Sequence, residues 1–268
     1  MYQSHWGLRD TPFRTRLDPS GFYHSPTHEE ALARLHFLVG QRRGLGLVTG
    51  ASGSGKSLLL EVFAEEIRRS GRAVAKTSLL GVETAEMLWQ LAAGLGCNPK
   101  RSATVGSLWQ VLSDRLVEHR YEQLDTVLLL DDADQARRDL LTQVVRLVHL
   151  GTAPQSRLTV VLAGQPSRMK HLGSDLLELV ELRIDVEPWD QAETEQYVTS
   201  SLERVGSNAS IFADNAVARL QELTHGVPRH VNQLADLALI AGAGEDLQQI
   251  DADVVQSAYD ELALVDAH

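Results

Sequence analysis

Residues 50–57 carry the pattern in this chain that could do chemistry. They read GASGSGKS, follow the apolar run 46–49 and precede an apolar helical pattern that starts at Leu58. A buried strand that leads into a glycine-rich turn and then a helix is the setting of a phosphate-binding loop. The glycines allow backbone conformations that a Cβ would block, so successive N–H groups can turn toward a polyphosphate. The predicted binding residues are Gly50, Ala51, Ser52, Gly53, Ser54, Gly55, Lys56 and Ser57.

Two side chains of this loop have distinct expected roles. The Lys56 ammonium is expected to reach the β- and γ-phosphates, and the Ser57 hydroxyl is expected to ligate Mg²⁺. The helix that begins here adds the positive end of its dipole. The chain contains no Asn-Lys-x-Asp motif that would read guanine, so the predicted cofactors are ATP and Mg²⁺.

A second motif supplies two carboxylates. The apolar run 127–130 ends in Asp131 and Asp132, which is typical of a Walker B strand. A buried strand would bring Asp131 to the carboxyl edge of a sheet, where it could hold Mg²⁺ opposite Ser57. We assign the role of base to Asp132, although related ATPases more often have Glu here. Because a misplacement of about 1 Å can cost ~10²-fold in rate, either the site is adapted to Asp or turnover is slow.

The elements that must position these residues follow from the hydrophobic pattern. Apolar strands that alternate with helices predict an α/β fold, a parallel sheet covered on both faces. The spacing between Lys56 and Asp131 leaves room for an additional strand between the two motif strands, which is the ATPase arrangement. Residues 1–24 are expected to be irregular. Besides 46–49, the predicted strands are 73–78, 126–130, 158–163 and 181–186, and the predicted helices between them are 84–95, 104–120 and 137–150.

After Pro188 the strand pattern stops, and four helices are predicted. We therefore expect a P-loop core at residues 1–187 and a small all-helical lid domain at 188–268. The helices are expected at 190–205, 213–225, 228–242 and 251–263, with Asp190, Asp214 and Asp251 as caps.

Composition limits the classes of function. A chain of 268 residues with 43% hydrophobic residues can bury a substantial core. The single cysteine, Cys97, excludes an intramolecular disulfide and fits a reducing cytoplasm. No stretch approaches the ~20 apolar residues of a membrane span and no signal peptide is visible, so we expect a cytoplasmic protein without membrane insertion. The net charge of −11 does not favour a surface built for nucleic acid.

Short motifs along nearly the whole chain match one known family. The residues that carry the match are Trp6-Gly7-Leu8, Pro12-Phe13, Phe22-Tyr23-His24-Ser25, His28, Ala31-Leu32, the loop at 50–57, LLLDDAD at 128–134, Gly164-Gln165-Pro166, Leu182-Arg183-Ile184, Glu193, Tyr197, Gly226-Val227-Pro228-Arg229 and Asn232. In order and spacing they resemble the AAA+ ATPases of the ExeA/GspA-like branch, whose relatives include the transposition-targeting ATPases MuB, TniB and TnsC.

This resemblance implies further roles. Gln165 would be the sensor 1 residue that detects the γ-phosphate, and Arg229, at the start of a lid helix, would be the sensor 2 arginine over the phosphates. Arg183 is the candidate for an arginine presented to a neighbouring subunit. The rival arginines are Arg146, Arg157 and Arg168, and the segment 23–28 is expected either near the adenine or simply packed in the core.

The predicted function is an ATPase that couples nucleotide state to lid movement and to remodelling of a protein partner or a homo-oligomer. The resemblance adds secretion or envelope assembly as its setting. Two alternatives stay open. One is an ATP-dependent DNA-binding adaptor, for which the nearest basic candidates are Arg42-Arg43, Arg68-Arg69-Arg72 and Arg137-Arg138. The other is a nucleotide switch with slow turnover, which Asp132 in place of Glu would explain.

Overall fold

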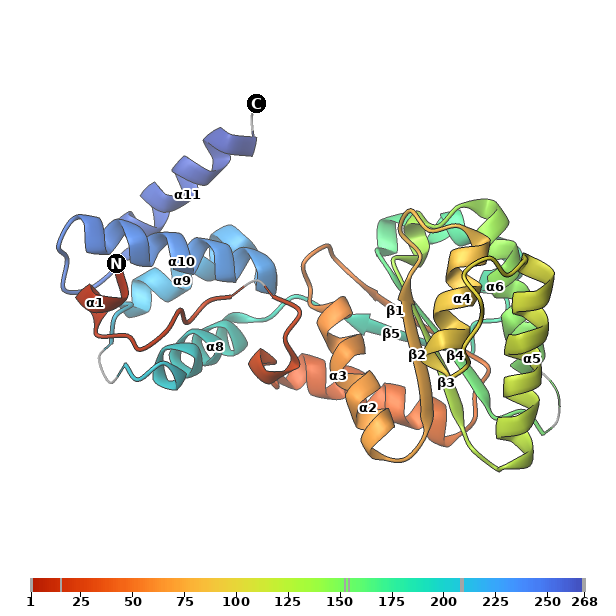
Figure 1. Cartoon of the computed structure of the whole chain (residues 1–268). Coiled ribbons are helices and arrows are strands. Elements are labelled where there is room, and N and C mark those ends of the chain that lie inside the picture. Colours follow the sequence, from red (N-terminus) through yellow and green to blue (C-terminus); the bar gives the residue numbers. More distant parts are fainter. Residues whose placement is uncertain (1, 15, 152, 154, 208–209, 267–268) are drawn as a thin grey trace. The chain divides into compact units, whose positions relative to one another are not determined.

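The computed structural model describes residues 2–14, 16–151, 153, 155–207 and 210–266 (Figure 1). The chain forms two compact units. The sheet unit comprises residues 28–52 and 56–186, and the helical unit comprises residues 1–27, 53–55 and 187–268. The predicted division into residues 1–187 and 188–268 stays a prediction of domain boundaries.

The sheet unit is built on five parallel strands. They are β1 (Leu45–Gly50), β2 (Ala73–Ser78), β3 (Thr126–Asp131), β4 (Leu158–Gly164) and β5 (Leu182–Val186), in the order β2-β3-β4-β1-β5. In the sequence β2 lies between the two motif strands, as the spacing of Lys56 and Asp131 predicts, and in the sheet β4 lies between them. The middle strands are buried along their whole length, as expected for a parallel sheet with both faces covered.

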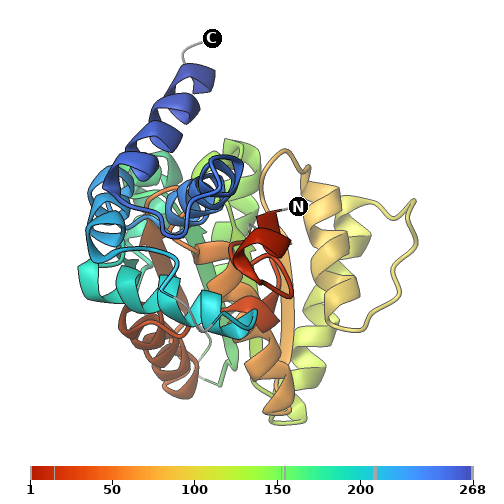
Figure 2. The same cartoon turned by 90° about the vertical axis from the view of Figure 1, so that its left-hand side faces the viewer.

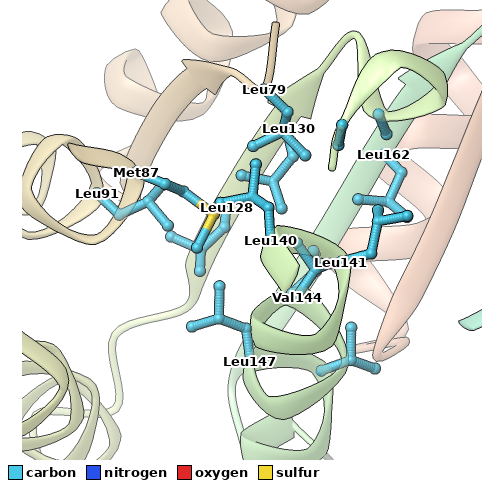
Figure 3. Close-up of a cluster of buried hydrophobic side chains, with 14 of the residues drawn as sticks. Leu79, Met87, Leu91, Leu128, Leu130, Leu140, Leu141, Val144, Leu147 and Leu162 are labelled. Carbon is cyan, nitrogen blue, oxygen red and sulfur yellow. The ribbon is translucent and has the colours of Figure 1, made fainter. Parts of the chain in front are cut away.

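Helices cover both faces of this sheet (Figure 1). The helices α4, α5 and α6 pack on one face, and α2 and α3 pack on the other. Leucine side chains from alternate positions of β3, such as Leu128 and Leu130, meet Met87 and Leu140 on the first face (Figure 3). The bounds are α2 (Pro26–Gly40), α3 (Lys56–Arg69), α4 (Thr84–Gly94), α5 (Val105–Tyr121), α6 (Arg138–Gly151) and α7 (Ser174–Leu177), with 3-10 helices η2 (Ala133–Gln135) and η3 (Pro166–Leu172).

The strand register brings the chemistry-bearing residues to one edge of the sheet. Thr49, just before the glycine loop, lies opposite Gly164, and Ser78 lies opposite Asp131. Leu130 pairs with Leu162, so β3 and β4 end at nearly the same level. The loop after β1, the acids after β3 and Gln165 after β4 therefore all follow the carboxyl edge, where sites in such sheets form.

The helical unit contains α8 (Gln191–Arg204), α9 (Asp214–Thr224), α10 (Pro228–Gly244) and α11 (Ala252–Asp266) around an apolar core. Asp190 caps α8 in a full capping box, and Asp251 accepts hydrogen bonds from two backbone N–H groups of α11, so these two predicted caps are confirmed. The predicted cap Asp214 is wrong. It is the first residue of α9, and the cap position is taken by Ala213, whose side chain can accept no hydrogen bond.

The prediction that residues 1–24 are irregular is also wrong in part, because they contain α1 (Tyr2–Trp6) and the 3-10 turn η1 (Pro19–Gly21). The indole of Trp6 donates to the carbonyl oxygen of Leu239 in α10 at 2.9 Å, and the Tyr2 hydroxyl donates to Asp236 at 2.6 Å. The contact between α1 and α10 can be followed in Figure 2. Burial and this hydrogen bond raise the pKa of Tyr2 to about 12. Tertiary contact thus orders a short helix that its own sequence would not stabilise.

Among the described residues, no helix has both the length and the apolar character that crossing a membrane would require.

Candidate functional site

The glycine loop has the backbone conformation that its sequence predicts at two of its three glycines. Gly53 has φ +84° and Gly55 has φ +91°, in the region that L-amino acids with a Cβ rarely adopt. The expectation for Gly50 is wrong, since it does not have a positive φ and is the last residue of β1, opposite Val186. A conformation suited to a glycine nest therefore begins after Gly50 rather than at it.

Lys56 is the first residue of α3, and its side chain folds back over the loop. Its buried ammonium donates to the carbonyl oxygens of Gly50 and Ala51, both at 2.8 Å. Ser57 follows at the second position of the helix and is partly exposed. A loop with two left-handed glycines, a cationic side chain held across it and a helix N-terminus behind it fits a polyphosphate, and the Ser57 hydroxyl and Asp131 carboxylate are oxygen ligands that fit Mg²⁺.

The two acids at the end of β3, Asp131 and Asp132, have different environments. Asp131 is the last residue of the strand and is buried, with one carboxylate oxygen accepting the backbone N–H of Asp132 at 2.9 Å. Asp132 is half-buried and has a left-handed backbone, φ +54° and ψ +33°. Asp tolerates this region better than Glu because its short polar side chain can bond locally. The backbone thus offers a physical reason for Asp at this position.

Ser78 is a residue of this site that the sequence reasoning missed. It ends β2, and its hydroxyl donates to Oδ2 of Asp132 at 2.7 Å. The backbone N–H of Leu79 also donates to the carbonyl oxygen of Asp131 at 2.9 Å. The available signal was that the predicted strands 73–78 and 126–130 are sequence neighbours in a parallel sheet, where strand ends meet.

Gln165 directly follows β4 and is half-buried. Its side chain does not cap the 3-10 helix η3 that starts behind it. The position matches the one expected for a residue that detects the terminal phosphate, although its role stays a prediction. Asp134, in the 3-10 turn after the two acids, is buried and was not singled out from the sequence as a site residue.

Arg229 is the second residue of α10 and its side chain is exposed. Its backbone N–H donates to the carbonyl oxygen of Gly53 at 3.2 Å, within the helical unit, to which residues 53–55 belong. A Cβ added to Gly53 would lie 2.8 Å from the Cβ of Arg229 and 3.1 Å from Val227. The turn that precedes α10 therefore packs against the tip of the glycine loop.

Arg183 lies on the edge strand β5 and is exposed. Its guanidinium donates to Oδ1 of Asp185 through Nε at 2.9 Å and contacts the same oxygen through Nη2 at 2.8 Å. Asp185 also accepts from the Thr49 hydroxyl. Burial acts to raise the pKa of Asp185, but the hydrogen bonds from Thr49 and Arg183 outweigh it and hold that pKa below its usual value.

The rival arginines occupy other places. The Arg146 guanidinium lies over the Trp109 ring, 4.0 Å from its centroid. Arg157 precedes β4 at the amino edge and pairs with Asp125 at 2.7 Å, so it lies at the opposite edge of the sheet from the glycine loop. Arg168, in η3, is exposed. Arg183, Arg168 and Arg146 are all exposed, and of these Arg183 is paired with Asp185.

The segment expected near adenine is packed against α8 and against Trp189, two residues before that helix. Tyr23 contacts the rings of Trp189 and Tyr197, with centroids 5.6 and 5.2 Å apart. The Trp189 indole donates to the Ser25 hydroxyl at 3.1 Å. Burial raises the pKa of Tyr23. These contacts support the interpretation that the segment is packed in the core. Its proximity to adenine stays a prediction.

A five-stranded parallel sheet in this order, with a glycine-rich phosphate loop after β1 and acids after β3, defines the class of AAA+ P-loop folds. A family model described as an AAA domain matches residues 39–172, which is half of the chain. The chain belongs to this AAA domain family.

Among curated proteins, the chain is similar to general secretion pathway protein A of Aeromonas hydrophila. The two are 27% identical over 265 residues, which cover 97% of this chain and 48% of that protein. The chain therefore spans about half the length of this relative. The predicted resemblance to the ExeA/GspA-like branch is confirmed.

Solved structures with the same fold include Drosophila ORC bound to DNA, with a TM-score of 0.72 and 19% identity over 98% of this chain and 66% of that one. Cdc6p from Pyrobaculum aerophilum gives a TM-score of 0.70 and 16% identity over 97% and 70% of the two chains. At these identities the likeness establishes the fold, and it confirms the predicted α/β architecture with a C-terminal helical part.

Proposed function

We propose that the chain binds Mg·ATP at residues 50–57 and hydrolyses it. The observation that carries this proposal is the strand register, which brings the glycine loop, the acids after β3 and Gln165 to one edge of the sheet. Membership of the AAA domain family supports nucleotide binding and suggests ATPase activity. Mg²⁺, held by Ser57 and Asp131, would neutralise charge between the β- and γ-phosphates.

Each side chain has a separate part in the proposed reaction. Lys56 leaves the carbonyl oxygens that it now contacts and binds the β- and γ-phosphates. Asp132 accepts a proton from the attacking water. Gln165 donates a hydrogen bond to the γ-phosphate, and Arg229 neutralises charge that develops on it. These assignments extend the sequence predictions, and the positions at the sheet edge and on the loop tip support them.

The proposed output is movement of the helical unit and remodelling of a partner. The hydrogen bond between Arg229 and Gly53 supports this coupling, because it ties the start of α10 to the loop that would hold the phosphates. We also propose that ATP promotes self-association, with Arg183 presented to a second copy from the exposed edge strand. Secretion or envelope assembly is the proposed setting, from the similarity to general secretion pathway protein A, and a cytoplasmic location stays a prediction.

A specific observation also favours a second candidate, a nucleotide switch with slow turnover. The proposed base, Asp132, is one methylene shorter than Glu, and Ser78 already donates to one of its oxygens. A carboxylate that is one methylene short and already accepts a hydrogen bond is badly placed to take a proton from the attacking water.

The DNA-adaptor alternative receives little support from charge. Five of its seven candidate arginines form ion pairs with acids of the same chain, which reduces the positive charge available to phosphates. The paired residues are Arg42, Arg43, Arg69, Arg72 and Arg137. DNA retention that depends on ATP and falls steeply with salt would restore this alternative.

The testing experiment measures phosphate release per subunit from Mg·ATP across a wide range of protein concentration. Lys56→Ala provides the blank. If a second copy completes the site, the specific activity rises with concentration. Arg183→Ala then removes this rise, because an arginine supplied by a second copy can be worth about 10³–10⁵ in turnover. Arg157→Ala, at the other edge of the sheet, is the matched control and keeps the rise.

A rate that stays at the blank, with ATP still bound, would favour the switch. Absence of nucleotide binding in the wild type, at concentrations where Lys56→Ala also fails to bind, would overturn the proposal.

A further inference from the structure

Asp134 is a buried carboxylate with no part in the reaction described so far. It lies in the 3-10 turn η2, three residues after Asp131, and is 5% exposed. Its Oδ2 is fully buried and has no hydrogen-bond partner among the described residues. A buried acceptor without a donor is costly, and native structures rarely keep one without a reason.

The carboxylate lies against the end of the neighbouring strand. A Cβ added to Gly164 would lie 2.6 Å from Oδ1 of Asp134 and 2.7 Å from Cε of Met169, so only glycine leaves room for the carboxylate here. Gln165 is the next residue, with its Cα about 3.8 Å further along the chain. Gln165, whose side-chain amide carries two N–H donors, therefore directly follows the glycine against which the Asp134 carboxylate lies.

A glutamine side chain has two N–H donors on one nitrogen, which can serve two acceptors at once. We propose that Asp134 is a positioning residue, which accepts one amide N–H of Gln165 and thereby aims the other at the γ-phosphate. The inference rests on the proposed function and deepens it. It explains three observations together: the orphaned oxygen, the glycine beside it, and a Gln165 side chain that caps no helix.

The test uses four variants of the full chain: Asp134→Leu, Asp134→Asn, Gln165→Ala and the double variant Asp134→Leu/Gln165→Ala. Three quantities are measured for each, namely kcat, the ratio of ATP to ADP affinity, and Tm. Asp139→Leu, which changes an exposed acid on α6, is the matched control and leaves kcat unchanged.

We expect Asp134→Leu and Gln165→Ala each to lower kcat about tenfold or more, and to weaken ATP binding while ADP binding is unchanged. The double variant loses no more than the worse single variant, because the two residues act through one hydrogen bond. Asp134→Asn, which keeps one carbonyl acceptor, retains most of the activity. Asp134→Leu keeps or raises the Tm, since it replaces an unpartnered buried carboxylate with an apolar group of similar size.

Losses in kcat that multiply in the double variant would overturn the inference. So would a fall in Tm and in ADP affinity that parallels the loss of activity. Failure of the proposed function can be told apart from failure of this inference. If the wild type binds ATP but does not hydrolyse it, the ratio of ATP to ADP affinity can still be measured, and Asp134→Leu must lower that ratio. A wild type that binds no nucleotide would overturn both.

Discussion

Removal of the Ser78 hydroxyl is expected to raise the rate of ATP hydrolysis. That hydroxyl donates to Oδ2 of Asp132 at 2.7 Å. A donated hydrogen bond is stronger to a full negative charge than to a neutral group. The proposed base must gain a proton during the reaction. The hydrogen bond therefore stabilises the ground state more than the transition state, and Ser78→Ala removes that difference.

The magnitude follows from the exposure of the pair. A hydrogen bond to a charged group contributes about 1.5–3 kcal/mol when it is shielded from water. Ser78 is exposed and Asp132 is half-buried, so water competes for both groups, and we take about 1 kcal/mol. Since about 1.4 kcal/mol corresponds to a factor of ten in rate, Ser78→Ala should raise kcat about fivefold.

The assay is steady-state phosphate release at saturating Mg·ATP and constant protein concentration. Ser78→Thr keeps the hydroxyl and should retain the wild-type rate. Ser70→Ala is the control for loss of a serine hydroxyl elsewhere, because Ser70 donates to the carbonyl oxygen of Ile67 at the end of α3. A fall in kcat for Ser78→Ala, with an unchanged rate for Ser70→Ala, would refute the reasoning and show that Ser78 orients the base instead of restraining it.

Three further predictions concern the loop, the helical unit and a buried histidine. Gly53→Ala should lower ATP affinity at least about tenfold in calorimetric titration, because φ is +84° at this position and the new Cβ would lie 2.8 Å from a neighbouring side chain. Gly71→Ala is the control, since Gly71 also has a positive φ but nothing lies close to its added Cβ, and it should leave ATP affinity unchanged. Glu193→Gln should cost about 1–2 kcal/mol in urea unfolding, because its carboxylate accepts hydrogen bonds from both the backbone N–H and the hydroxyl of Thr27. Burial lowers the pKa of His119 below 6.5, so the unfolded chain binds its proton first and stability falls as the pH drops from 7.5 to 5.5. His119→Gln should make that fall smaller, by comparison of unfolding free energies at the two pH values.

Each of these predictions has an outcome that contradicts it. Equal losses of ATP affinity in the Gly53 and Gly71 variants would mean that crowding at the loop tip is unimportant. For Glu193, the control is Glu195→Gln on the exposed side of the same helix, and an equal loss of stability would remove the argument. For His119, an unchanged dependence on pH would show that the imidazole is as easily protonated in the folded chain as in the unfolded one.

The sequence was sufficient for the local features of the site. Residues 50–57 identify a phosphate loop because glycine, lysine and serine at this spacing serve one chemistry. Apolar runs that alternate with helical patterns predict the parallel sheet, because strands buried on both faces must be apolar throughout. Asp190 could also be predicted as a helix cap, because the side-chain oxygen of a cap bonds backbone groups only a few residues away.

Only the tertiary structure decided which residues meet across elements. The pairing of Ser78 with Asp132 depends on β2 lying beside β3, and the contact of Asp134 with Gly164 depends on β4 lying on the other side of β3. Short helix α1 forms because Trp6 and Tyr2 find partners on α10, more than 200 residues along the chain. Hydrophobic periodicity and helix capping depend on residues only a few positions apart, so the local sequence is enough to predict them. Contacts between distant segments depend on strand order and register, which no local pattern encodes.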